Sequence, residues 1–190
     1  MATDSMARQA QLLTSVAVVL LLAGCRNTTV PDVWVNEGDV TFRTQRGVTY
    51  YQGQPFSGWS FSTVSSGDTV SITPYLRGRR EGISQAWYVA GVGKEIGMYH
   101  RGNKVGEHRG WYEDGTLRFI SHYRDDVYHG NVKEWQPNGL LYRDFNYEEG
   151  HEKGLQQMWE SDGRLKANYE AREGRKYGLA GSMNCQSATK

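Results

Sequence analysis

The side chains best suited to chemistry in this sequence are five histidines and two cysteines. His122 and His129 flank Asp125 and Asp126, a group of residue types that can bind a metal ion or transfer protons. Their spacing is not typical of metal ligands, and a solvated loop is the simpler interpretation. The five histidines also fall at unrelated positions along the chain. We therefore expect no catalytic site, no metal and no cofactor.

Cys25 has the more specific chemical signature, because it ends an apolar run that begins at Leu12. The run is too short for an ordinary membrane span and follows a short polar start containing Arg8, as in a secretion signal. Leu22-Ala23-Gly24-Cys25 resembles the lipobox of bacterial lipoproteins, in which the cysteine thiol receives diacylglycerol. The alternative is an ordinary signal peptide with a chance cysteine. Translation from Met1 or from Met6 leaves the same apolar run.

The lipobox resemblance predicts the organisation of the N-terminus. Residues 1–24 would be the signal peptide, and residues 25–32 the lipidated N-terminus and a tether. Arg26 follows the cysteine, so the usual inner-membrane retention signal is missing. The resemblance then implies an outer-membrane anchor facing the periplasm, where several acyl chains hold firmly. Lipidation would leave Cys185, which lies in the C-terminal tail of residues 184–190, without an intramolecular partner.

The dominant pattern in the chain is a repeat with a spacing of 24 residues. Its first glycine recurs at Gly58, Gly82, Gly106, Gly130, Gly154 and Gly178. Tryptophan follows this glycine at a fixed distance in four units, at Trp87, Trp111, Trp135 and Trp159. Tyrosine does the same at Tyr75, Tyr99, Tyr123 and Tyr147. A fixed period of this length is typical of a stacked array whose units cannot bury their apolar faces alone.

Each unit is predicted to be a β-hairpin. Asp114-Gly115, Asn138-Gly139 and Asp162-Gly163 lie midway between short runs with strand character. Pro137 favours a three-residue loop, in which a type I turn is closed by a left-handed glycine. We therefore predict an all-β fold, an elongated single-layer antiparallel meander of β-hairpins over residues 58–183.

The three-residue loop also predicts which side chains share a face of the sheet. One face would carry Trp111, Leu117, Phe119 and Tyr123, then Trp135, Leu141, Phe145 and Tyr147, then Trp159, Leu165 and Tyr169. The opposite face would carry His108, Arg118, His122, Gln136, Asn146, Glu160, Lys166 and Glu170. Gly93 stands where leucine recurs later, which predicts a shallow notch beside Trp87.

Residues 33–57 are predicted to form an atypical terminal unit that caps the array. Val33–Val35 and Val40–Phe42 flank Asn36-Glu37-Gly38-Asp39, a pattern that predicts a small hairpin. Val48–Tyr51 would follow as the second strand of a half repeat, because Tyr51 falls in the frame of the later tyrosines.

The unit G-x₄-W-[YQE]-x-[DN]-G-x-L, with a tyrosine eight residues after the second glycine, is clearest from Gly106 to Gly130. It resembles the MORN repeat, and especially the bacterial variant in proteins labelled YwqK-like antitoxins. The resemblance covers residues 48–183. It implies a twisted, single-layer antiparallel meander, and an antitoxin or immunity function in which the sheet occludes a toxin.

Composition narrows the functional classes. With 22 basic and 21 acidic residues and no basic block, the chain lacks the charge that nucleic-acid binding needs. We expect a non-enzymatic, lipid-anchored module that binds a protein partner, with a structural envelope scaffold, a binder of lipid headgroups or glycan, and lastly an enzyme as alternatives. The aromatic residues fit two interpretations, a spine that packs on itself and a ladder that binds a partner. The predicted binding residues are Trp87, Trp111, Trp135, Trp159, Tyr99, Tyr123 and Tyr147.

Overall fold

The computed structural model describes residues 29–180. These residues form two β-sheets, one of thirteen strands and one of three. Within this part of the chain there is no α-helix, and so none with the length and apolarity that a membrane crossing needs. The predicted all-β fold is confirmed, and the main sheet is a long, mostly antiparallel meander.

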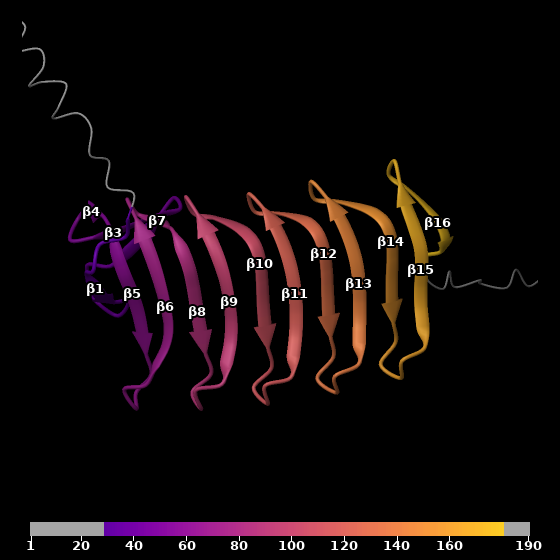
Figure 1. The fold of residues 1–190 in the computed structure, drawn as a ribbon. Coiled ribbons are helices and arrows are strands. Elements are labelled where there is room, and N and C mark those ends of the chain that lie inside the picture. The colour runs from indigo at the N-terminus through magenta and orange to yellow at the C-terminus, as the bar shows by residue number, and fades with distance from the viewer. Residues whose placement is uncertain (1–28, 181–190) are drawn as a thin grey trace, which may run out of the picture.

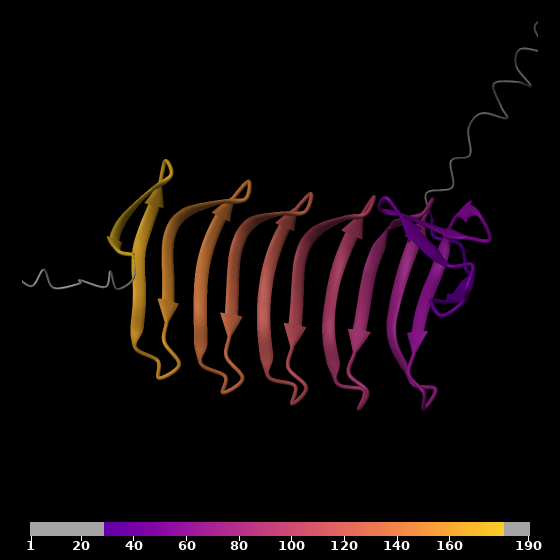
Figure 2. The same ribbon diagram turned by 180° about the vertical axis from the view of Figure 1, so that it is seen from behind.

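The strands follow one another along the chain with short connections (Figures 1 and 2). The N-terminal strands are β1 (Trp34–Asn36), β2 (Arg43–Gln45), β3 (Val48–Tyr51) and β4 (Gln54–Pro55). The strands of the first two hairpins are β5 (Gly58–Thr63), β6 (Thr69–Leu76), β7 (Arg79–Arg80), β8 (Gly82–Trp87) and β9 (Gly93–His100). The remaining strands are β10 (Asn103–Trp111), β11 (Leu117–Arg124), β12 (Val127–Trp135), β13 (Leu141–Glu148), β14 (His151–Trp159), β15 (Leu165–Arg172) and β16 (Arg175–Leu179).

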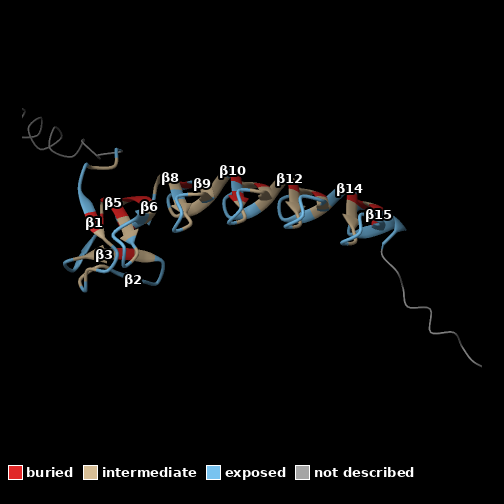
Figure 3. Cartoon of the chain, turned by 90° about the horizontal axis from the view of Figure 1, so that it is seen from below, coloured by how far each residue is buried: buried red, intermediate tan, exposed pale blue. Residues whose placement is uncertain are grey.

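The main sheet has the order β1-β5-β6-β8-β9-β10-β11-β12-β13-β14-β15-β16, with β7 paired to β6. Every neighbouring pair is antiparallel except β1 and β5. Figure 3 shows the hairpins in a single row, with β2 and β3 beside β5 and β6 at one end.

The hairpin loops have the predicted three-residue form. The Gly115 N–H donates to the Tyr112 carbonyl oxygen at 3.0 Å, and the Tyr112 N–H donates to the Thr116 carbonyl oxygen at 2.8 Å. Gly115 has a φ of +84°, in the left-handed region that glycine adopts at no steric cost. Gln136 and Gly139 repeat this geometry around Pro137, which occupies the second position of the turn. The predicted loop type is therefore confirmed.

A bulge beside each loop changes the face assignment that the loop alone predicts. Trp111 pairs with Leu117, but the next residue, Gly110, pairs with Phe119, so Arg118 is an extra residue in β11. Because side chains alternate along a strand, Trp111 and Leu117 share one face while Phe119 and Tyr123 lie on the other. The prediction that these four residues share a face is wrong. The same shift separates Trp135 from Phe145 and Tyr147, and Trp159 from Tyr169.

We call the two sides of the main sheet the tyrosine face, which carries Tyr75, Tyr99, Tyr123 and Tyr147, and the tryptophan face, which carries Trp87, Trp111, Trp135 and Trp159. His108 belongs to the tyrosine face, since its ring centroid lies 5.3 Å from that of Tyr99 and 5.0 Å from that of Tyr123. The predicted polar face is therefore wrong as well. His122, Asn146 and Glu170 share a face with the tryptophans, whereas His108 lies opposite them.

The recurring glycines Gly106, Gly130 and Gly154 lie in a second set of bulges. Their φ angles are +67°, +110° and +77°, a region that side chains with a Cβ rarely adopt. At these points the register with the preceding strand shifts, for example between Ser121 and Tyr123. Figure 1 shows β10, β12 and β14 leaving the upper turn sideways and then bending along the sheet.

The buried residues of the array form cross-strand pairs on the tyrosine face. The pair nearest the N-terminus of the array is small, Ser60 with Thr73, and the later pairs are larger. These later pairs are His108 with Ser121, Val132 with Phe145, and Gln156 with Tyr169. His108, Val132 and Gln156 are at most 1% exposed. A single-layer sheet thus obtains a core by packing large side chains along one of its own faces.

The N-terminal unit departs from its predicted hairpin. β1 does not pair with Val40–Phe42 but runs parallel to β5, with Trp34 opposite Trp59. The Trp59 N–H donates to the Val33 carbonyl oxygen at 2.7 Å. This pairing satisfies backbone groups of β5 that a separate hairpin would leave open at the sheet edge. Val48–Tyr51 is a strand, as predicted, and belongs to the small sheet β2-β3-β4.

The glycines of β9 and β10 offer a direct test of packing on the tyrosine face. A Cβ on Gly110 would lie 2.2 Å from the Phe119 ring, whereas a Cβ on Gly93 would meet nothing closer than 3.9 Å. Gly110→Ala should therefore lower the free energy of unfolding by about 1–3 kcal/mol through overpacking. Gly93→Ala is the matched control and should change it by less than about 0.5 kcal/mol. Chemical denaturation measures both.

A double variant separates steric overlap from a general loss of strand stability. Gly110→Ala combined with Phe119→Leu should cost less than the two single changes added together, because the shorter side chain leaves room for the new methyl group. Strict additivity of the two changes would show that Phe119 does not press on residue 110.

Candidate binding surface

The N-terminal half of the tryptophan face is apolar and open to solvent. Ile83 is 48% exposed and Met98 is 46% exposed, far more than the paired residues of the tyrosine face. Together with Ile96 and Trp111 they line a hollow of about 470 Å³, and Glu107 and Arg109 stand at its border. An exposed apolar hollow with a polar rim is typical of an interaction site.

A difference at the glycine bulges explains why the hollow is apolar. At the later bulges a polar side chain bonds the bulged backbone, with the His122 Nδ1 2.8 Å from the Asn131 carbonyl oxygen. Likewise, the Asn146 Nδ2 donates to the Leu155 carbonyl oxygen at 2.6 Å. Met98 holds the same position one repeat earlier, and a thioether has no hydrogen to donate. On its β9 side, the bulge between Val105 and Arg109 therefore faces the thioether of Met98 and not a hydrogen-bond donor.

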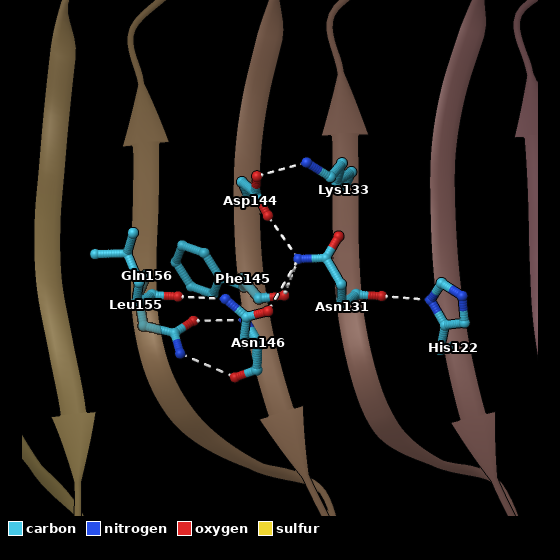
Figure 4. Close-up of polar contacts among 8 residues, drawn as sticks. All are labelled: His122, Asn131, Lys133, Asp144, Phe145, Asn146, Leu155 and Gln156. Atoms are coloured by element: carbon cyan, nitrogen blue, oxygen red, sulfur yellow. Dashed lines mark hydrogen bonds and ion pairs between the residues drawn. The ribbon is translucent and has the colours of Figure 1, made fainter.

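The C-terminal half of the same face is closed by a polar network (Figure 4). The Asn131 Nδ2 donates to Asp144 Oδ1 at 2.6 Å and to Asn146 Oδ1 at 3.1 Å. Lys133 Nζ lies 2.7 Å from the other Asp144 oxygen. From the tyrosine face, Gln156 accepts from the Asn146 N–H at 3.0 Å and donates to the Asn146 carbonyl oxygen at 2.9 Å. These groups satisfy one another, so the network holds adjacent strands together.

A second hollow, of about 670 Å³, lies near the hairpin loops, and its lining includes Phe119 and Glu134 of the tyrosine face. Trp135 of β12, Tyr142 of β13 and Trp159 of β14 line it, with Arg118 and Glu160 at its border. The Tyr112 hydroxyl donates to the Trp135 carbonyl oxygen at 2.8 Å, and the Gln136 Nε2 donates to the Glu160 carbonyl oxygen at 3.1 Å. Each repeat therefore fixes the position of the next along this edge.

The tyrosine face is a packed ladder and not an open surface. The Tyr123 and Tyr128 rings are stacked with centroids 4.9 Å apart, and Tyr128 lies 5.1 Å from Tyr147. Lys104 lies over the Tyr123 ring at 5.0 Å, an attractive cation–π geometry. Burial raises the pKa of the Tyr123 and Tyr147 hydroxyls, so both stay neutral at physiological pH.

The seven predicted binding residues are thus not brought together. The four tryptophans lie on one face, while Tyr99, Tyr123 and Tyr147 belong to the ladder on the other. Gly93 is not an open notch, because the Trp111 ring lies 3.9 Å from the position of its missing Cβ. Sequence reasoning missed Ile83 and Met98. Their position one repeat before the polar residues Glu107 and His122 was the available signal.

The candidate chemical groups are used in structural contacts. His122 Nε2 lies 3.3 Å from Glu107 Oε2, and the Glu149 N–H donates to His129 Nδ1 at 3.5 Å. Glu148 pairs with Lys153. Among residues 29–180, no group of three or more histidines, cysteines, aspartates or glutamates is placed to hold a metal ion. Cys25 and Cys185 lie outside the described residues.

Comparison of the chain with protein-family models and with curated proteins finds no match.

The folded structure disfavours the protonated form of His108. Its Nε2 donates to the Met98 carbonyl oxygen at 3.0 Å, so Nδ1 carries no proton and lies unpaired against Gly97. Burial lowers the pKa of His108 below its ordinary value of 6.5, and the bond to Met98 offsets this only in part. Protonation of His108 would place an N–H at Nδ1, where it would be buried without an acceptor.

The lowered pKa predicts a pH dependence of stability. The neutral ring is favoured in the folded state, so its contribution is complete above the unfolded pKa of about 6.5. That contribution is lost as the pH falls through 6.5 toward the lower folded pKa. Denaturation at pH 8 and pH 5 should show a larger loss for the wild type than for His108→Gln. Gln156 occupies the same position two repeats later, so glutamine fits the array. Equal losses would mean that His108 does not titrate with folding.

Proposed function

We propose that the protein is a non-enzymatic binding module that recognises a protein partner through the tryptophan face. The observation that carries this proposal is the exposed apolar hollow formed by Ile83, Ile96, Met98 and Trp111. The chain fills the tyrosine face with its own side chains but leaves this half of the tryptophan face uncovered. Large apolar side chains surrounded by polar residues are where protein interfaces concentrate their binding energy.

The border of the hollow supports a protein partner. Glu107 and Arg109 lie two residues apart on β10, are paired to each other, and are about 36% and 50% exposed at their side chains. Such a pair can re-form bonds with the backbone or side chains of a partner at the rim of an interface. Met98 adds a flexible, polarisable side chain that adapts to different apolar groups.

We further propose that the array is a MORN-type repeat with a 24-residue period. The positive-φ glycines at bulges and the tryptophan–leucine pairs beside the loops support this assignment, since each recurs with the sequence spacing. In this proposal the protein has an antitoxin or immunity function, and its partner is a toxin that is prevented from reaching its target when it is bound on the tryptophan face. That partner class rests on the sequence resemblance.

Partner capture by single variants tests the use of the hollow. Ile83→Arg places a charge in its apolar wall and should reduce recovery of a crosslinked envelope partner at least tenfold, because a buried unpaired charge is strongly unfavourable. Val40→Arg is the matched control, since Val40 is 84% exposed and lies outside the main sheet. Circular dichroism should show both variants folded. Full recovery with folded Ile83→Arg would contradict the proposed surface.

We also propose that Cys25 carries a lipid anchor, which places the module at the cell envelope on the outer membrane and facing the periplasm. Cys25→Ser should move the protein from the membrane fraction to the soluble fraction, because the thiol that receives diacylglycerol is removed. Labelling with a radioactive fatty acid should mark the wild type alone. A Cys25→Ser protein that stays with membranes after a high-salt wash, beside an unlabelled wild type, would refute the anchor.

A further inference from the structure

The two ends of the main sheet differ in how their backbone edges are protected. At the N-terminal end, β1 covers β5, and the Glu37 N–H donates to the Phe61 carbonyl oxygen at 2.8 Å. β1 is itself three residues long, and the Asn36 carbonyl oxygen accepts the Asp39 N–H at 3.0 Å. At the C-terminal end, β16 pairs with β15 alone, and all five residues of β16 are exposed (Figure 1). Of these two ends, the C-terminal one therefore presents the longer open edge within the described part of the chain.

An earlier strand at the same phase of the sequence repeat shows which backbone groups of β16 are open. Lys104 and Lys176 hold the same phase, and their partners in the preceding strands, Tyr99 and Ala171, do so too. Both backbone groups of Lys104 face away from β9, because its N–H donates to Asp126 Oδ1 at 2.7 Å and its carbonyl oxygen accepts the Asp126 N–H at 3.1 Å. The backbone N–H and carbonyl of Lys176 therefore face away from β15, and no described strand lies on that side.

Gly178 is the second open position of β16. Backbone groups alternate in direction along a strand, so the N–H and carbonyl of Gly178 face the same side as those of Lys176. The φ of Gly178 is +117°, and this conformation is compatible with pairing on that side. Gly130, at the same phase, has a φ of +110° and pairs with Tyr147 of the following strand. The outer edge of β16 thus resembles the edge on which an earlier strand of the array receives its next neighbour.

The side chains of β16 permit another strand at this edge. Proteins often protect an edge strand with proline or with lysine, which discourage pairing. β16 contains no proline, and its lysine bonds to its own sheet. Lys176 Nζ lies 3.0 Å from the Tyr169 hydroxyl and 3.1 Å from Glu152 Oε2. Tyr177 and Leu179, by contrast, are 54% and 50% exposed on the tryptophan face, where an added strand would cover part of their apolar surface.

We propose that two copies of this chain associate through β16, whose outer edges pair antiparallel about a two-fold axis at Tyr177. Lys176 of each copy then exchanges backbone hydrogen bonds with Gly178 of the other, so the edge is complementary to itself. Tyr177 lies opposite its counterpart, and Arg175 lies opposite Leu179 of the second copy, so no two like charges face each other. Because the short β1 protects the other end of each sheet, the assembly closes as a dimer. This inference goes beyond the proposed function and does not rest on it.

Association of the pure protein tests this inference. Sedimentation velocity is measured on the full mature chain carrying Cys25→Ser under reducing conditions, so that neither acyl chains nor a Cys185 disulfide can join two copies. We expect a reversible dimer with a Kd between about 1 μM and 1 mM, because a pairing this short makes a small interface. Hydrogen exchange at the backbone N–H groups of Lys176 and Gly178 should slow as the protein concentration rises, since dimerisation bonds both groups.

Two variants of Lys176 isolate the backbone contribution. Lys176→Pro removes an N–H that faces away from β15, so it should weaken dimerisation by about tenfold or more while the ladder to β15 keeps its bonds. Lys176→Ala is the matched control, because it removes the side chain and keeps the N–H, and it should change the Kd by less than about twofold. Circular dichroism should show that both variants are folded.

A charge comparison at Leu179 tests the register of the pairing. Leu179→Glu places a carboxylate opposite Arg175 of the second copy, whereas Leu179→Lys places a like charge there. The glutamate variant should therefore dimerise about tenfold more tightly than the lysine variant. Both variants lose the same leucine, so the difference between them reports the charge that faces residue 179. Equal affinities would overturn the antiparallel register.

Other results would overturn the dimer itself. One is a chain that stays monomeric at about 1 mM. Another is a dimer with the same Kd in Lys176→Pro and Lys176→Ala, which would place the contact outside β16. Slow hydrogen exchange at Lys176 and Gly178 in a protein that stays monomeric would also overturn it, because another part of the same chain, such as residues 181–190, would then cover the edge.

Discussion

The structure depends on backbone bulges that only glycine accommodates well. Each glycine at the start of the repeat has a positive φ, from +67° at Gly106 to +149° at Gly58, where an added Cβ would be strained. At Gly130 the bulge lets β12 bend against β11, with His122 facing the extra residues. Because the bend recurs at the same place in β10, β12 and β14, successive hairpins superpose and their side chains fall into columns.

Those columns solve the main difficulty of a sheet with one layer, which has no second layer to bury its apolar groups. Val132 becomes fully buried by lying between neighbours of its own face, across from Phe145. His108 reaches 1% exposure between two tyrosine rings, because Gly97 leaves space for its imidazole. Stability in such an array comes from contacts between adjacent units, so each column must match in size along its whole length.

Much of this arrangement was predictable from the sequence, but the faces were not. Asn138-Gly139 after Pro137 predicted the three-residue loop, and the regular glycines predicted repeated hairpins. The extra residue at Arg118 has no turn residue, proline or glycine to mark it, since a bulge of this kind accepts ordinary side chains. One unmarked residue moves every later side chain to the other face. The parallel pairing of β1 with β5 was equally hidden, because it joins residues distant in the sequence, such as Trp34 and Trp59, whose rings stack with centroids 5.5 Å apart.

The apolar side of the sheet changes along the array, and this change limits where a partner can bind. On the tyrosine face the pairs grow from Ser60 and Thr73 to Gln156 and Tyr169, while the tryptophan face passes from Ile83 and Met98 to polar residues. In the C-terminal half the tryptophan face carries the bonds of Asn131 to Asp144 and Asn146, while Leu155 and Leu165 remain 49% and 44% exposed. The N-terminal half has hydroxyl groups on its packed side and aliphatic groups facing solvent. This exposure of Ile83 and Met98 is why we propose a binding surface in preference to a purely structural role.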